Sequence, residues 1–346
     1  MAYGFRNLVF EGGGVKGIAY VGSLQVMEEK GVLSDIDRVG GTSAGAINAV
    51  LAALNYTNTE ILDILKTLNF NNFMDDSWGV VRDINRLTDD YGWYKGDFFR
   101  EWIGQLIHEK TGNSNLTFSG LKNHPNNFRD LYVCATNLST HFSEVFSAEH
   151  TPRMRIADAV RMSMSIPLFF AAVRHQPRND IYVDGGVLRN YPIKLFDREK
   201  YIKENEAQSF SLSTKYYDKA TKLLSEKHPS SSKYTYNKQT LGFRLDSKAE
   251  IAMFRDGAEP NHNKINDFFD YAFNLVNTLM DAELNNHLHS DDWQRTMYID
   301  TLGIGTTDFD LSDEQKMSLV ESGREGAKQY FDWFDNPNNN AINRPV

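Results

Sequence analysis

Residues 5–31 read FRNLVFEGGGVKGIAYVGSLQVMEEKG, and this stretch places a strand, a glycine turn and a helix in direct succession. The apolar run over residues 5–10 predicts a strand, and apolar residues at helical spacing over 18–27 predict a helix that stops at Gly31. The same order recurs at residues 37–54. Because this alternation is typical of parallel strands connected by helices, it predicts an α/β fold with a mostly parallel sheet. Further strands are expected at residues 131–140, 180–186, 240–245 and 297–305.

The glycine turn GGGVKG matches the dinucleotide-binding fingerprint G-x-G-x-x-G at Gly12, Gly14 and Gly17. Asp35 and Asp37 follow at about the distance where such a site places its ribose-binding acid. A P-loop is excluded, because no Gly-Lys-Ser/Thr closes the turn. The turn alone therefore leaves two interpretations open, a nucleotide site or a loop of backbone amides that binds another anion.

Residues 41–45, GTSAG, match the nucleophile elbow G-x-S-x-G. In such an elbow a serine occupies a sharp turn from strand to helix, and Gly41 and Gly45 would remove side chains that crowd it. Ser43 would then stand at a helix N-terminus, where free amides favour developing negative charge. Small residues that serve only packing in the turn are the alternative. A hydrolase with this nucleophile also needs backbone N–H groups for its oxyanion, and the glycines at 12–14 can supply them.

A serine nucleophile needs a partner that accepts its proton. Asp184 is the best-placed candidate, because IYVDGG puts it at the carboxyl end of a predicted strand, with Gly185 and Gly186 opening room beside it. An ordinary Asp-Gly turn is the alternative. A Ser-His-Asp triad is the competing mechanism, but no later histidine lies in a strand-end loop of the required type. These histidines are His228, His262, His287 and His289.

In this combination and order, EGGGVKG, GTSAG and the later DGG make the chain resemble the patatin-like phospholipases. ATNLST (135–140) and SMSIPLFF (163–170) resemble the segments that this family places between elbow and acid. The likeness covers residues 5–195, and the pattern of 240–330 is compatible with the same domain. It implies a three-layer α/β/α sandwich that hydrolyses acyl esters of lipids through a Ser-Asp dyad, with no histidine, metal or other cofactor.

Carried over by motif, the resemblance makes Ser43 the nucleophile and Asp184 the base. Lys16 fills the basic position of the glycine loop, where it would brace the turn; a solvated lysine is the alternative. Glu11 departs from the aspartate of plant members. The implied oxyanion loop is Gly12, Gly13 and Gly14, and the supporting positions are Lys16, Gly17, Gly41, Gly45, Gly185 and Gly186.

The implied substrate is a phospholipid or another lipid ester, reached by transient contact with a membrane surface. A neutral-lipid lipase, a general esterase and a non-catalytic lipid-binding module are the alternatives. The net charge of −9 offers no nucleic-acid-binding surface. No signal peptide or long apolar span is expected, which favours a cytoplasmic or membrane-peripheral protein, with delivery by a non-classical route open. An activating partner and a homodimer both stay open.

One catalytic domain is expected over residues 1–335, followed by a disordered tail at 336–346. The Ser-, Lys- and Tyr-rich stretch 205–238 predicts a surface insertion or lid. Residues 265–280 have the spacing of an apolar helix. The aromatic-rich region 71–112 predicts core packing, with an acyl-chain entrance as the alternative, and the single cysteine, Cys134, is predicted to be a buried core thiol.

Overall fold

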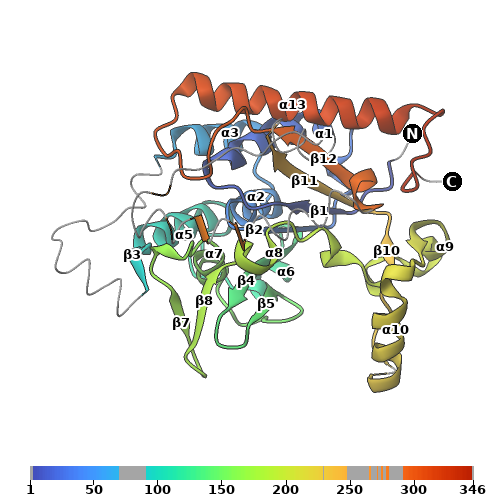
Figure 1. Cartoon of the computed structure of the whole chain (residues 1–346), viewed down its shortest axis with the longest axis horizontal. Coiled ribbons are helices and arrows are strands. Elements are labelled where there is room, and N and C mark those ends of the chain that lie inside the picture. Colours follow the sequence, from blue (N-terminus) through green and yellow to red (C-terminus); the bar gives the residue numbers. More distant parts are fainter. Residues whose placement is uncertain are drawn as a thin grey trace.

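The computed structural model describes residues 3–69, 91–228, 230–247, 265, 271, 274, 275, 278, 279 and 291–344. An eight-stranded sheet runs through the molecule in the order β12-β11-β1-β2-β4-β8-β7, with β5 paired to β4 (Figure 1). Its strands are β1 Asn7–Phe10, β2 Arg38–Thr42, β4 Asp130–Asn137, β5 Phe142–Ser147, β7 Val173–His175, β8 Asp180–Asp184, β11 Thr240–Asp246 and β12 Thr296–Asp300. Two small sheets pair β3 Gly92–Tyr94 with β6 Leu168–Phe170, and β9 Ser211–Leu212 with β10 Tyr236–Asn237.

The pairing of the main sheet confirms the predicted mostly parallel arrangement. Strands β12, β11, β1, β2 and β4, taken in that order, are each parallel to the next. The sequence did not predict the antiparallel part, in which β5 and β8 pair with β4, and β7 pairs with β8. Strands β5 and β7 carry exposed and half-buried side chains, so they lack the apolar run that marks the parallel strands.

Helices cover the sheet on both faces. The α-helices are α1 Ala19–Glu29, α2 Ala44–Ala53, α3 Asn58–Thr67, α5 Asp97–Thr111, α6 Phe118–Lys122, α7 Ile156–Ser163, α8 Gly186–Arg189, α9 Ala207–Phe210, α10 Lys215–Lys227 and α13 Asp313–Asp335. The 3-10 helices are η1 Gly14–Ile18, η2 Leu33–Asp35, η4 Ile193–Phe196, η5 Glu199–Tyr201, η6 Glu204–Glu206 and η7 Asp291–Arg295. Helix α13 begins with a capping box formed by Ser312 and Gln315 and lies along α1 (Figure 1).

Successive side chains of β1 point to opposite faces of the sheet and pack into two separate apolar layers. Phe10 stacks on Phe243 of β11 at 4.8 Å between ring centroids and meets Tyr20 of α1 edge-on at 5.3 Å. Val9 points to the opposite face, where it belongs to a second buried cluster that includes Phe196 of η4. The observed fold is therefore the predicted α/β sandwich with the sheet as its middle layer. No helix in the described part of the chain is long and apolar enough to cross a membrane.

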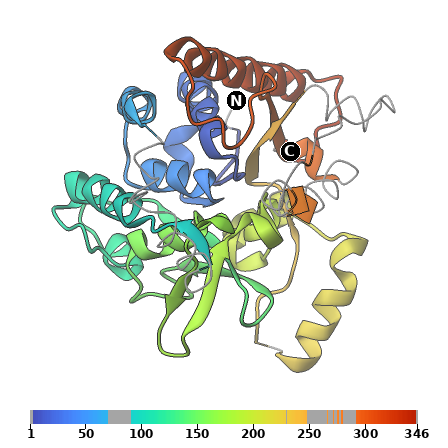
Figure 2. The ribbon, with the colours of Figure 1, turned by 60° about the vertical axis from the view of Figure 1, so that its left-hand side comes forward.

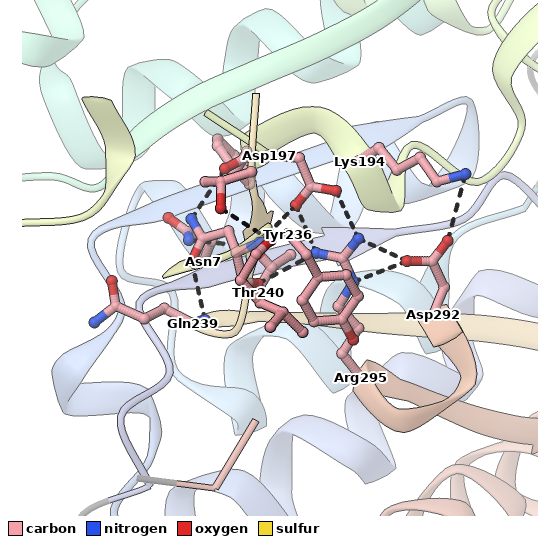
Figure 3. A network of polar contacts seen from close by, with 12 residues as sticks. Asn7, Lys194, Asp197, Tyr236, Gln239, Thr240, Asp292 and Arg295 are labelled. Carbon is pink, nitrogen blue, oxygen red and sulfur yellow. Dashed lines mark hydrogen bonds and ion pairs between the residues drawn. The ribbon is translucent and has the colours of Figure 1, made fainter. Parts of the chain in front are cut away.

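The stretch 205–238 contains helices α9 and α10, and a buried ion-pair network lies where it joins the main body. Arg295 of η7 donates to both carboxylate oxygens of Asp197, at 2.6 and 2.7 Å, and to Asp292 (Figure 3). Asp197 also accepts from the backbone N–H of Asn237, which ends β10 and lies three residues before the start of β11. This network lies at the amino end of β11, whereas Ser43 follows the carboxyl end of β2. Helix α10 stands away from the main body (Figures 1 and 2), and this placement favours the surface insertion over the lid.

The C-terminal residues differ from the expected disordered tail. Residues 336–344 fold back onto α13, where Asn343 donates to the Tyr330 hydroxyl at 3.1 Å and Arg344 donates to the backbone carbonyl of Phe334. Asn343 is fully buried, and this hydrogen bond connects its side-chain amide to α13. The predicted helix 265–280 and residues 71–90 of the aromatic-rich region lie largely or wholly outside the described residues. Cys134 is buried in β4, as predicted.

Candidate active site

Ser43 occupies a sharp turn between β2 and α2, at the carboxyl edge of the parallel strands. Its backbone angles are φ 54° and ψ −128°, a conformation that non-glycine residues adopt only at a cost in free energy. A methyl group at Gly41 would lie 2.3 Å from the carbonyl oxygen of Gly45, and one at Gly45 would lie 2.4 Å from the carbonyl oxygen of Glu11. The two glycines flanking the serine are therefore required by close backbone packing, as the motif predicted.

Asp184 reaches Ser43 through the antiparallel pairing of β8 with β4. Cys134 lies opposite Thr42 in β2, and the next residue of β4, Ala135, lies opposite Asp184. The end of β8 is thereby brought beside the elbow, and Ser43 Oγ donates a hydrogen bond to Asp184 Oδ2 at 2.7 Å. Two residues separated by 141 positions in the chain are thus in direct contact.

The Asp184 carboxyl is completely buried, and burial raises its pKa from the ordinary 3.8 to about 7. Hydrogen bonds from the Ser43 hydroxyl and from the backbone N–H of Gly186, the latter at 2.7 Å to Oδ1, partly offset this rise. Gly185 is equally constrained, because a methyl group there would lie 2.4 Å from the Cys134 carbonyl oxygen. A carboxyl with this pKa accepts protons near neutral pH far better than an ordinary aspartate does.

Ser163 is a further part of the elbow that the sequence reasoning missed. Its hydroxyl accepts a hydrogen bond from the backbone N–H of Ser43 at 2.8 Å and donates one to the carbonyl of Cys134 at 2.6 Å. The next residue, Met164, places its sulfur 3.4 Å from Ser43 Oγ. The resemblance had singled out 163–170 as a family-like segment, which was the signal available, but it had assigned no role to Ser163.

The glycine loop lies directly beside the elbow. A methyl group at Gly12 would lie 3.1 Å from Ser43 Cβ. However, the N–H of Gly12 already donates to the carbonyl of Asn190 at 3.1 Å, so its expected part as an oxyanion donor is not supported. Within the described part of the chain, the N–H groups of Gly13 and Gly14 have no hydrogen-bond partner. Gly14 has φ 56°, the left-handed region that favours glycine.

The remaining predicted positions support this loop. Gly17 packs closely on the start of α2, because a methyl group there would lie 3.2 Å from Ala44 Cβ. Lys16 is half-buried, and its Cε would lie 3.5 Å from a methyl group at Gly13, which places its aliphatic stem over the loop. Its positive charge also lowers the raised pKa of Glu11.

A narrow, mainly apolar groove begins at the glycine loop and continues between η1, α2 and α3. Its lining residues are Gly14, Val15, Gly17, Ile18, Ala44, Ile47, Asn48, Leu65, Phe309, Leu311 and Lys316. Gly14 and Ala44 directly follow Gly13 and Ser43 in the chain, but Gly13 and Ser43 are not among the lining residues, and the groove encloses only about 10 Å³.

Histidine takes no part in the described contacts of this site. The described hydrogen bonds of Ser43 and of the Asp184 side chain join them to each other and to Ser163, Met164 and Gly186. His228 ends α10 on the distant insertion, and the three other late histidines lie outside the described residues. Nor does any group of three acidic, histidine or cysteine side chains in the described ranges have the arrangement to hold a metal ion.

Comparison with known families adds an independent result. The family model for patatin-like phospholipases matches residues 8–197, more than half of the chain. The chain belongs to the patatin-like phospholipase family. This membership indicates a lipid hydrolase, and the match spans the glycine loop, the elbow and Asp184.

Relatives extend the likeness beyond these motifs. An uncharacterised protein of Bacillus subtilis is 29% identical over 331 residues, covering 91% of this chain and 94% of that protein. A probable lipid hydrolase of Invertebrate iridescent virus 6 is 25% identical over 191 residues, covering 55% of this chain and 63% of that protein. Among solved structures, VipD from Legionella pneumophila has a TM-score of 0.58 at 18% identity, covering 95% of this chain and 67% of that one, so it shares the fold.

Proposed function

We propose that this protein is a lipid acyl hydrolase of the phospholipase A type, with Ser43 as nucleophile and Asp184 as base. The observation that carries the proposal is the 2.7 Å hydrogen bond between Ser43 Oγ and a fully buried carboxyl. Burial raises the pKa of this carboxyl to about 7, so near neutral pH a large fraction of it is ionised and able to accept a proton.

The proposed reaction begins when Ser43 Oγ attacks the ester carbonyl carbon and its proton moves to Asp184. The carbonyl oxygen becomes an oxyanion, to which the N–H groups of Gly13 and Gly14 donate. Collapse of this intermediate breaks the ester bond, and Asp184 returns the proton to the departing alcohol. A water molecule then gives a proton to Asp184 and attacks the acyl-enzyme. Collapse of this second intermediate breaks the bond to Ser43 Oγ and releases the fatty acid, and Asp184 returns the proton to Ser43 Oγ.

The raised pKa sets the expected pH dependence. Only ionised Asp184 accepts the serine proton, so kcat/KM should fall as pH drops through about 7. If the base were an aspartate with an ordinary pKa, kcat/KM would be retained down to about pH 4. A triad mechanism would instead require a histidine, and no described histidine contacts either residue.

The apolar groove supports a lipid as substrate. Its lining includes Ala44, which directly follows Ser43, and most of its lining side chains are aliphatic or aromatic, so an acyl chain would contact an apolar surface there once the narrow groove widens to admit it. We place substrate capture at a membrane surface, by transient peripheral contact. The groove recognises the acyl chain and not the head group, so a neutral-lipid lipase or general esterase is the second candidate function.

The test is lipid product analysis by mass spectrometry on mixed vesicles of phosphatidylcholine and triacylglycerol, with wild type beside Ser43→Ala. Free fatty acid and lysophospholipid should form with wild type only, and a fluorophosphonate probe should label wild type at Ser43 only. Release from triacylglycerol alone would favour the neutral-lipid lipase. Full activity in a folded Ser43→Ala variant, or labelling elsewhere, would overturn the assignment.

A further inference from the structure

Asn190 forms hydrogen bonds with both backbone polar groups of Gly12, its N–H and its carbonyl. Its backbone carbonyl accepts the N–H of Gly12 at 3.1 Å, and its side-chain Nδ2 donates to the carbonyl of Gly12 at 3.2 Å. The same Nδ2 lies 3.4 Å from Glu11 Oε1. Asn190 is buried, and a methyl group at Gly12 would lie 2.3 Å from its Oδ1, so the two segments are in close contact.

Glu11, the residue before Gly12, forms hydrogen bonds with β11 and α1. Its Oε2 accepts the backbone N–H of Leu245 in β11 at 2.6 Å, and its backbone carbonyl accepts the Tyr20 hydroxyl of α1 at 2.7 Å. The side chain of Glu11 is buried, and its pKa is raised to about 8 mainly by that burial. Three separate elements therefore converge on the residue pair that leads into Gly13.

The glycine loop depends on such contacts for its direction. Three successive glycines have no side chains to fix their torsion angles, so neighbouring groups must select one conformation. Gly12 is held, and Gly13 and Gly14 follow it with N–H groups that lack partners in the described part of the chain. Gly12 also lies close to the nucleophile, because a methyl group at Gly12 would lie 3.1 Å from Ser43 Cβ.

The segment before Asn190 connects this grip to the base. Helix α8 starts at Gly186, whose N–H donates to Asp184 Oδ1, and ends at Arg189, next to Asn190. The carbonyl of Arg189 accepts the Thr42 hydroxyl at 2.9 Å, one residue before the nucleophile. The base, the nucleophile and the glycine loop are thus fixed to one short segment.

We propose that Asn190 and Glu11 are positioning residues that aim the N–H groups of Gly13 and Gly14 at the oxyanion. The inference rests on the proposed hydrolase function, and it assigns the orientation of the oxyanion donors to the side chains of Glu11, the first residue of EGGGVKG, and Asn190, which lies outside the three motifs. Gly12 then serves as the fixed point of the loop rather than as a donor.

The test compares Asn190→Ala with wild type on a p-nitrophenyl ester and on its thionoester counterpart, in which sulfur replaces the carbonyl oxygen. Sulfur is a weak hydrogen-bond acceptor, so the thionoester gains little from aimed N–H groups. Loss of one oxyanion donor costs roughly 10² to 10³ in kcat. We expect kcat for the oxygen ester to fall about 100-fold with KM within a few-fold, and kcat for the thionoester to fall less than tenfold.

Asn58→Ala is the matched control, because Asn58 is also buried and also donates to a glutamate, Glu28, at 2.7 Å, but lies in α3 away from the loop. This variant should keep kcat for both substrates within about twofold of wild type. Asn190→Leu provides a second variant of similar shape that has no polar hydrogen to donate, and it should reproduce the ester-selective loss even if Asn190→Ala does not fold.

The results separate this inference from the proposed function. An equal loss of kcat on both substrates, or a kcat for the oxygen ester within threefold of wild type in folded Asn190→Leu, would overturn the positioning role. If wild type hydrolyses lipid esters, Ser43→Ala is inactive and the Asn190 variants keep full kcat, only this inference fails. If Ser43→Ala retains the activity of wild type, the proposed function fails first.

Discussion

Replacing Asp184 by asparagine should inactivate the protein and stabilise it at the same time. Asparagine keeps the shape of the side chain, can accept the N–H of Gly186 and can donate to Ser43 Oγ, so the local contacts survive. It cannot accept the serine proton, so kcat/KM should fall by roughly 10² to 10⁴. The gain in stability follows from removing a carboxyl whose ionisation is disfavoured by burial in the folded protein.

The size of this gain follows from the raised pKa. Burial takes the Asp184 pKa from 3.8 in the unfolded chain to about 7 in the folded protein. Between these values the folded state keeps a proton that the unfolded state has released, so stability falls as pH rises. The difference of about three pKa units, at about 1.4 kcal/mol each, corresponds to about 4 kcal/mol above pH 7 and to about 2 kcal/mol at pH 5.

Urea denaturation of wild type and Asp184→Asn at pH 5, 6, 7 and 8 measures this difference directly. The free energy of unfolding of the variant should exceed that of wild type by an amount that grows up to about pH 7 and then stays constant. Ser43→Ala is the control, because it is expected to be equally inactive but retains the carboxyl. Its stability should keep falling with pH at least as steeply as that of wild type, since Ser43 lowers the Asp184 pKa through its hydrogen bond.

Two outcomes would refute this reasoning. If Asp184→Asn is no more stable than wild type at pH 8, the buried carboxyl carries no penalty for ionisation in the folded protein. If the difference in unfolding free energy is the same at pH 5 and pH 8, it comes from packing or unfolded-chain effects and not from the carboxyl.

Three further changes probe the elbow, the glycine loop and the buried ion-pair network. Ser43→Gly should be more stable to urea than Ser43→Ala by about 1 kcal/mol, because φ 54° strains alanine and not glycine; equal stability would argue against strain at the elbow. Gly14→Ala should lower kcat by roughly 10² to 10³, since a methyl group there would lie 2.0 Å from the Thr306 carbonyl oxygen; unchanged turnover in a variant folded by circular dichroism would contradict an oxyanion role. Arg295→Met should lower the free energy of unfolding by about 3–5 kcal/mol, because it leaves buried Asp197 without its bidentate partner, and a loss below 1 kcal/mol would contradict this.

Much of the candidate site was accessible from short stretches of sequence, because its constraints are local. A strand followed at once by GTSAG requires a serine in a tight turn, and glycines on both sides are needed within five residues of chain. The parallel strands were predictable for a similar reason, since both faces are buried and the runs are continuously apolar. Asp184 was found because it ends the short predicted strand IYVD and precedes two glycines.

Contacts between distant segments were beyond sequence reasoning, because they depend on how strands pair. The antiparallel register of β8 on β4 brings Asp184 within 2.7 Å of Ser43 Oγ, and the burial that raises its pKa follows from the same packing. The glycine loop shows the limit most directly. Its three glycines look alike in the sequence, but the carbonyl of Asn190 occupies the N–H of Gly12, so that only Gly13 and Gly14 are left with free N–H groups among the described residues.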